Sequence, residues 1–170
     1  LILIRPMIRD RFSGLIRSLE NANLTVVTIK PQKFEELDNY WLMLGKLSGH
    51  EKKALQYIEN FHKNLAELKK KADSIPLKER KTVFFEARHK NNQTTSLDGI
   101  PAYILKVLDI KNVAFDATPA KKGSSVANFP KELLLSRGEE IDIYIAQYGA
   151  MNRSTIDIIK KAPGYNAIKA

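Results

Sequence analysis

The feature that most constrains the fold is a long amphipathic segment from Glu51 to Ser74. Its apolar residues recur at alternating spacings of four and three positions, the period of one face of an α-helix. Roughly 24 helical residues at about 1.5 Å each span about 36 Å, so we expect the helix to lie across a globular body. Ser48, three residues before Glu51, predicts a capping box at its start. The apolar stripe consists of Ala54, Ile58, Phe61, Leu65, Leu68 and Ala72.

A coiled coil would produce the same stripe. However, the segment holds only about three heptads, and the chain offers no second segment of this kind to pair with it. A helix packed along a globular body is therefore the favoured interpretation.

The residues before this helix predict a strand, a helix and a second strand. Leu1 to Ile4 is an apolar run, Asp10 to Asn21 has helical periodicity, and Leu24 to Ile29 is a β-branched run. This order predicts a parallel strand pair with a right-handed crossover, and Glu35 to Leu47 adds another helix. The chain opens directly on an apolar run, without an initiator Met or a signal peptide, so we expect it to be a piece of a longer chain.

A second α/β pattern follows the long helix, and the fold class predicted for the chain is α/β. The Arg5-Pro6-Met7 segment is expected to be a loop. The later elements expected are strands over 82–87, 112–115 and 141–147 and helices over 96–108, 130–137 and 154–161.

Composition narrows the function classes. The chain has no cysteine, which excludes a disulfide framework, a thiol nucleophile and thiolate metal ligands. Its net charge of +9 raises nucleic-acid binding. The lysines are nevertheless spread along helices and interleaved with Glu, as in 67–71, and no RNA-binding aromatic run or zinc finger occurs. We therefore expect a solvated basic surface and no nucleic-acid partner.

Catalytic motifs are missing from the sequence. It contains no GxSxG, Walker A or GxGxxG pattern, and His50, His62 and His89 lie in separate segments. Only Glu86 and His89 leave one strand together, and a metal pair there stays open beside ordinary loop residues. Gly123-Ser124-Ser125 is expected to be a turn, although its backbone N–H groups would also suit an anion. The prediction is no catalytic residue, no metal ligand and no cofactor.

Polar residues instead gather where predicted strands end. Open α/β sheets bind ligands beyond the carboxyl ends of their strands. Such ends carry the segments Arg5–Met7, Glu86–His89 and Gln147–Arg153. Arg, His, Tyr, Met and Asn together suit a bulky ligand that is partly aromatic and partly anionic. The sequence thus predicts a binding site rather than a catalytic one.

Several motifs, each weak alone, resemble in their order the class III substrate-binding proteins that deliver ferric siderophores, haem and cobalamin to ABC importers. The first is Tyr40–Gly49, which is similar to the segment that leads into the family's backbone helix. The others are Thr82–Ala87, Gly123–Ser125, the helix containing Glu132-Leu133-Leu134, Gln147–Arg153 and Pro163–Ile168.

This resemblance implies two α/β lobes joined by a long rigid helix, with a ligand between the lobes. Residues 1–48 would be the remnant of an incomplete N-terminal lobe, 49–75 the connecting helix and 76–170 the C-terminal lobe. The ligand would be an iron chelate, haem or a corrinoid, and the protein a monomer outside the cytoplasmic membrane. A periplasmic parent protein and a lipid-anchored one both stay open. The implied ligand-binding residues are Arg5, Met7, Arg88, His89, Tyr148, Asn152 and Arg153, and Glu132 would dock on the membrane permease.

Two other functions stay open at this point. A metal-inserting chelatase can share the sheet topology and needs a His and an acid in its cleft, which only Glu86 and His89 offer. A helical interaction module built around 51–74 is the other alternative. A binding protein that is not an enzyme is the favoured interpretation.

Overall fold

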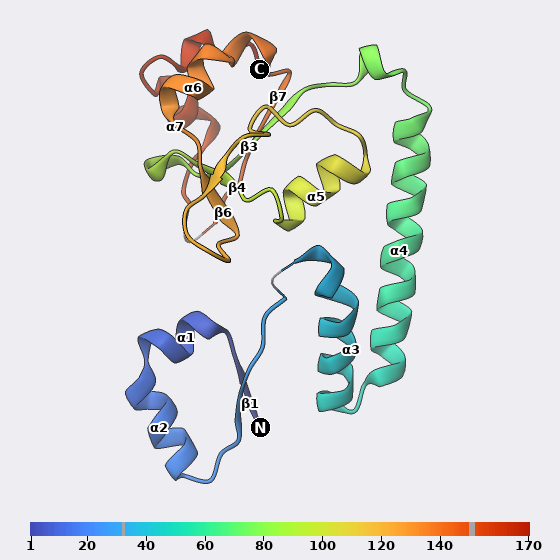
Figure 1. Ribbon diagram of the computed structural model, residues 1–170, viewed down its shortest axis with the longest axis vertical. Coiled ribbons are helices and arrows are strands. Elements are labelled where there is room, and N and C mark those ends of the chain that lie inside the picture. The colour runs from blue at the N-terminus through green and yellow to red at the C-terminus, as the bar shows by residue number, and fades with distance from the viewer. Residues whose placement is uncertain (32, 150–151) are drawn as a thin grey trace. The chain divides into compact units, whose positions relative to one another are not determined.

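The structure is a computed structural model that describes residues 1–31, 33–149 and 152–170 (Figure 1). The chain forms two compact units, residues 1–59 and 60–170. The division falls inside a helix, and each unit is described by itself below. The predicted three-part domain boundaries stay a prediction.

The first unit contains a parallel pair of short strands. β1 (Ile2–Ile4) and β2 (Val26–Thr28) align Ile2 with Val26 and Ile4 with Thr28. Two helices, α1 (Pro6–Arg11) and α2 (Ser13–Asn21), form the connection. The predicted parallel pairing is confirmed. A 3₁₀ turn (Phe34–Glu36) then leads into α3 (Leu37–Ser48).

Three predictions in this unit are wrong in detail. The Arg5–Met7 segment is not a loop, because Pro6 starts α1, where its missing N–H costs no hydrogen bond. The helix expected over 10–21 is broken at Phe12, whose φ of −126° and ψ of 45° leave the helical region. Ser48 does not cap the long helix: it is the last residue of α3, and its hydroxyl donates to the carbonyl of Leu44 at 2.8 Å.

The long helix is confirmed as α4 (Glu51–Asp73). Its start is fixed by Gly49, which ends α3 at a φ of 71° that glycine adopts without strain. No residue of α4 is fully buried. Five residues of the predicted stripe are half-buried, whereas Leu68 is 50% exposed. Among the described residues no helix combines the length and the apolar character needed to cross a bilayer.

The second unit contains a five-stranded mixed sheet in the order β5-β6-β4-β3-β7. β3 and β7 run parallel, with Val83 opposite Ile143 and Glu86 opposite Ala146, and the other pairs are antiparallel. The strands are β3 (Val83–Arg88), β4 (Gln93–Thr95), β5 (Thr118–Pro119), β6 (Val126–Asn128) and β7 (Ile143–Ala146). The helices are α5 (Ile100–Val107), α6 (Lys131–Ser136) and α7 (Ile156–Lys161), with 3₁₀ turns over Leu77–Glu79, His89–Asn91, Gly138–Glu140 and Tyr165–Ala167.

This sheet packs on the main core of the unit. Phe84 of β3 lies 5.7 Å, between ring centroids, from Phe129, which is 2% exposed. Arg137 closes one side of the core. It donates to the carbonyl of Val113 at 2.8 Å and binds both carboxylate oxygens of Asp116 at 2.7 Å.

The strand predictions are wrong for residues 112–115 and for β4, β5 and β6. The strand expected over 112–115 makes only one bridge, between Asn112 and Val83, and the Asn112 side chain then accepts from the N–H of Ala114 and turns the chain. β4, β5 and β6 were not predicted, because they are short and largely polar. Gly123–Ser125 forms the turn that was expected, with Ser124 N–H donating to Lys121.

Candidate functional site

The candidate site lies at the carboxyl ends of β3 and β7. Because these strands are parallel neighbours, the segments that leave them start at one edge of the sheet. A pocket of about 510 Å³ opens there. It is lined by Arg88, His89, Lys90, Asn91, Asn152, Arg153, Ser154 and Ile158.

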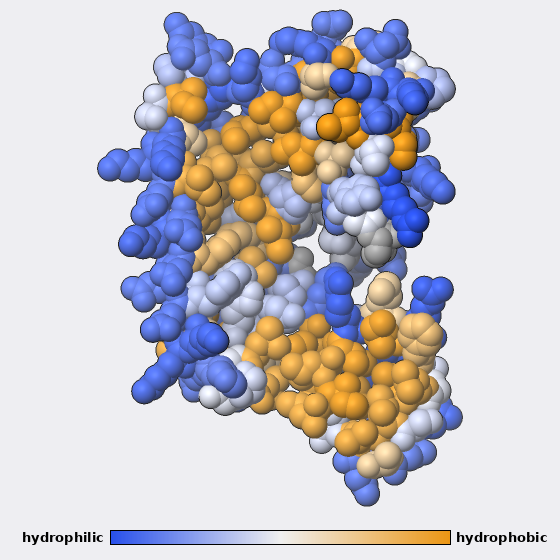
Figure 2. Space-filling model, turned by 180° about the vertical axis from the view of Figure 1, so that it is seen from behind, coloured by the Kyte–Doolittle hydropathy of each residue, from blue (hydrophilic) through white to orange (hydrophobic). Residues whose placement is uncertain are grey.

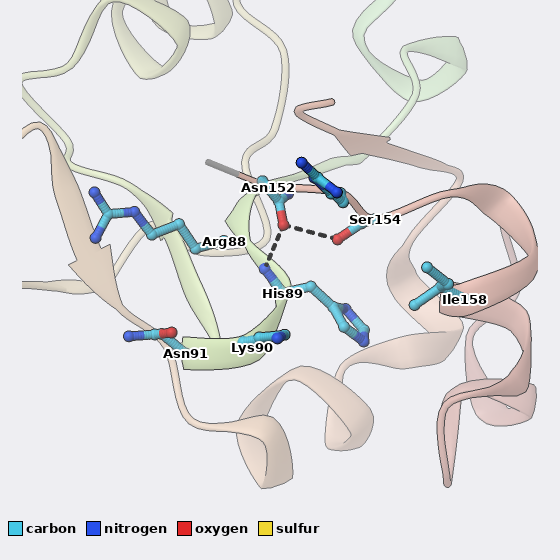
Figure 3. Close-up of a pocket in the computed structure, with 8 residues that line it drawn as sticks. Arg88, His89, Lys90, Asn91, Asn152, Ser154 and Ile158 are labelled. Carbon is cyan, nitrogen blue, oxygen red and sulfur yellow. Dashed lines mark hydrogen bonds between the residues drawn. The ribbon is translucent and has the colours of Figure 1, made fainter. Parts of the chain in front are cut away.

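Asn152 ties the two segments together (Figure 3). Its side-chain oxygen accepts from the backbone N–H of His89 at 3.2 Å and from the hydroxyl of Ser154 at 2.9 Å. Its amide nitrogen donates to the carbonyl of Gln147 at 2.7 Å. Asn152 is 7% exposed, so these bonds are shielded from water. The amide therefore fixes the pocket wall and is not available as a flexible ligand contact.

Beneath the pocket, Glu86 holds the side chain of His89. Its Oε2 accepts from His89 Nδ1 at 2.8 Å and from the hydroxyl of Tyr144 at 2.5 Å. Burial, and then the hydrogen bond to Glu86, raise the pKa of Tyr144, which therefore stays a phenol and donates. Burial also raises the pKa of Tyr165, whose ring lies 5.5 Å from that of His89.

The lining of the pocket is cationic. Arg88, Lys90 and Arg153 contribute positive charge, and none of the described lining residues is acidic. In Figure 3 the side chain of Arg88 extends away from the ring of His89, so the positive charge is distributed around the pocket. Guanidinium groups bind carboxylate and similar anionic oxygens in a planar, two-pronged manner. The arrangement suits an anionic ligand.

The structure brings four of the seven predicted ligand-binding residues into this pocket: Arg88, His89, Asn152 and Arg153. Of the other three, Tyr148 is 71% exposed and does not belong to the described lining. Arg5 precedes α1 and Met7 lies in its first turn, so both belong to the first unit. Their role as ligand contacts stays a prediction. Glu132 lies exposed in the first turn of α6, and its docking role also stays a prediction.

Sequence reasoning missed the other four lining residues. Lys90 and Asn91 lie in the 3₁₀ turn that follows β3. Ser154 directly precedes Thr155, the N-cap of α7, and Ile158 lies in the first turn of that helix. Their position directly beside Arg88 and Arg153 was the available signal. It was too weak to separate them from ordinary loop residues.

The chelatase alternative depended on Glu86 facing the cleft together with His89. The two side chains do meet, but Glu86 is 3% exposed and its Oε2 is occupied by Tyr144 and His89. Its carboxylate is therefore not placed to take a proton from a molecule in the pocket. Within the described residues no group of three or more His, Cys, Asp or Glu is arranged to hold a metal ion.

A family model described as "Periplasmic binding protein" matches residues 7–170. The chain belongs to this family. An ABC transporter substrate-binding lipoprotein of Bacillus subtilis strain 168, itself uncharacterised, is 32% identical over 120 residues and supports the same assignment. The match covers 69% of this chain and 38% of that relative.

Solved structures show the same fold. A possible iron-binding periplasmic protein of Staphylococcus epidermidis ATCC 12228 superposes with a TM-score of 0.73 at 23% identity, over 98% of this chain and 62% of that one. A siderophore-binding protein of Vibrio cholerae, solved with Fe³⁺-Desferal, gives a TM-score of 0.69 at 16% identity, over 98% of this chain and 60% of that one. The predicted α/β fold of a class III periplasmic binding protein is thus confirmed. The chain spans less than two thirds of each of these relatives.

Proposed function

We propose that this periplasmic binding protein is the solute-binding component of an ABC importer for an anionic metal chelate, of the siderophore or haem type. It captures this ligand outside the cytoplasmic membrane and delivers it to the permease, and it performs no chemistry on it. Family membership supports the transport role, and the names of the Bacillus subtilis and Vibrio cholerae relatives support the importer and the ligand class.

The pocket beside β3 and β7 is the observation that carries the ligand class. Arg88 and Arg153 line it from two chain segments, and no acid opposes them among the described lining residues. A buried or half-enclosed cationic site binds anionic oxygens more strongly than an exposed one, because less water screens the charges. Ferric chelates and haem present such oxygens.

Titration with a defined panel tests this proposal. Native mass spectrometry of the chain with ferric desferrioxamine, ferri-bacillibactin, haem and cobalamin should show a one-to-one complex with an anionic member. Arg153→Ala should weaken that complex by about 2 kcal/mol, the scale of a lost charge-assisted contact. Arg153→Lys should recover only part of the loss, since Lys lacks the planar fork.

A matched control is Lys160→Ala, which removes an exposed charge from α7 outside the pocket lining. It should leave the affinity unchanged. Equal affinities of the wild type and the Arg153 variants, or binding of cobalamin alone, would contradict an anion-binding pocket.

Docking on the permease is the second part of the proposal, and Glu132 is the residue proposed for it. A contact made by an exposed acid acts mainly on the association rate and is sensitive to salt. Glu132→Arg, in cells that produce the whole protein, should slow uptake and leave ligand affinity unchanged. Normal uptake would remove Glu132 from the docking surface, and a loss of ligand affinity would show that it acts elsewhere.

A further inference from the structure

The buried carboxylate of Glu86 has no part in the function proposed above. It lies within β3, is 3% exposed, and its Oε1 is buried without a hydrogen-bond partner in the described structure. A buried oxygen without a hydrogen-bond partner has lost its contacts with water and gained none in return, so it destabilises the folded chain. Because this destabilising carboxylate bonds directly to the pocket residue His89, a role in the pocket is the explanation to test.

The geometry around Glu86 fixes the ring of His89. A carboxylate oxygen only accepts hydrogen bonds, so both of its neighbours must donate. Tyr144 is a phenol and donates its O–H, and His89 donates from Nδ1. Nδ1 therefore carries hydrogen, and Nε2 is the ring nitrogen left to meet a molecule in the pocket.

Two further contacts prevent the ring from turning away. The backbone N–H of His89 is bonded to Asn152, which sets where the side chain starts. The ring itself meets the ring of Tyr165 edge to face, with the centroids 5.5 Å apart. The His89 side chain is 19% exposed and lines the pocket, so the fold encloses most of the ring and leaves part of it accessible.

We propose that Glu86 is a positioning residue of the pocket, which orients His89 so that Nε2 makes a direct contact with the ligand. This inference rests on the proposed function. Histidines that bind a metal usually donate their other ring N–H to a carboxylate or a similar acceptor, which sets the tautomer and the ring orientation, and the same geometry orients a ring toward a polar ligand. As an imidazolium, His89 donates to an anionic oxygen; as a neutral ring, it accepts a hydrogen bond or binds an open metal position.

The first experiment needs no ligand. Nitrogen-15 correlation spectra of the imidazole rings should show hydrogen on Nδ1 of His89, with a proton shifted far downfield by the carboxylate. Glu86→Leu should abolish that signal. Glu86→Gln should retain hydrogen on Nδ1, because its amide oxygen can still accept. The exposed His50 and His62 are internal controls and should not change in either variant.

The second experiment is a double-mutant cycle on affinity, with ferri-bacillibactin and haem as the two anionic probes. Glu86→Leu should weaken binding on the order of tenfold, the lower end of the effect seen when the carboxylate partner of a metal-binding histidine is removed. His89→Ala should do at least as much. In the His89→Ala background, Glu86→Leu should have no further effect, since it acts only through the ring. Glu86→Gln should restore most of the affinity.

The outcomes separate this inference from the function it rests on. If the two losses add fully, or if Glu86→Gln is as weak as Glu86→Leu, Glu86 supports the fold and does not position His89. Hydrogen on Nε2 alone in the wild type would also overturn the inference. If neither probe binds the wild type while the spectra are as expected, the proposed ligand class fails and the positioning of the ring stands. A loss with haem alone would place Nε2 against a group that haem carries and the triscatecholate lacks, either its iron or its carboxylates.

Discussion

The two units of the chain differ in how completely they bury their apolar side chains. In the first unit the described buried apolar residues are Ile16, Ile29, Phe34 and Leu37. Several large side chains stay exposed there, among them Leu1, Met7, Phe12 and Leu15, and Figure 2 shows hydrophobic residues gathered on the surface of this unit. The second unit encloses Phe84, Phe129 and Ile141 almost fully.

This difference explains why the candidate pocket belongs to the second unit. A binding site needs side chains that are held by a rigid scaffold, and a closed core supplies it. Glu86 and Asn152 are buried polar residues of this unit whose bonds reach the pocket lining. The first unit has a small core and a larger exposed apolar surface.

The largest expected effect tests the core difference directly. Phe129→Ala should lower the free energy of unfolding by about 3–5 kcal/mol, as truncation of a buried aromatic residue does. Phe12→Ala, at a residue 47% exposed in the first unit, should cost no more than about 0.5 kcal/mol. Urea unfolding followed by circular dichroism measures both. Equal losses would mean that the two units are packed equally well.

Two glycine-to-alanine substitutions should change the stability of the fold in opposite directions. A Cβ at Gly138 would lie 2.5 Å from the carbonyl oxygen of Ala167, a backbone atom that cannot rotate away. Gly138→Ala should therefore destabilise by about 1–3 kcal/mol. At Gly14, within α2, a Cβ meets nothing within 4 Å, and Gly14→Ala should stabilise by about 0.5 kcal/mol. Thermal melts decide, and a stabilising Gly138→Ala would show that the close approach is not real.

Removing the hydroxyl side chains at two helix ends should give smaller losses of stability, and the two losses should differ. Thr155 accepts from the N–H of Ile158 and caps α7, so Thr155→Ala should cost about 1 kcal/mol. Ser48 lies at the end of α3 in the first unit and caps no N–H group of α4 among its described bonds. Ser48→Ala should fall within about 0.5 kcal/mol. A larger loss at Ser48 than at Thr155 would restore the capping box expected from the sequence.

The smallest expected effect is a change in how the melting temperature depends on pH. The two hydrogen bonds from Arg137 hold the pKa of Asp116 below its usual value, and Lys169 does the same for Asp142. A lowered pKa means that stability is present above the unfolded value of about 4 and is lost as the pH falls through the folded value. Asp116→Asn should flatten the fall in melting temperature on acidification below about pH 4. An unchanged slope would show that this exposed pair is fully screened.

The elements that could be predicted from the sequence are those whose residue pattern is local. α4, the β1–β2 pair and the parallel strands β3 and β7 follow from periodicity and from β-branched runs. β4 has the sequence Gln-Thr-Thr and β6 Val-Ala-Asn, and runs this short become strands only by pairing with neighbours that are distant in the sequence. The predicted ends of β3 and β7 pointed to Arg88 and Arg153, which line the pocket, and their contact with a ligand stays a prediction. The burial of Glu86 could not be foreseen, because it depends on Tyr144, 58 residues away in the chain.

The distance between β3 and β7 along the chain has a consequence for how the protein is made. The bond that joins His89 to Asn152 closes a span of 63 residues, and contacts of such long range form slowly and late. At a synthesis rate of about 5–20 residues per second, the ribosome would add the first partner roughly 3–13 s before the second. During that interval the apolar residues of β3 have no β7 to pair with. The pocket is therefore among the last features to appear on a newly made chain, and nascent chains that stop before residue 152 should depend most on chaperones.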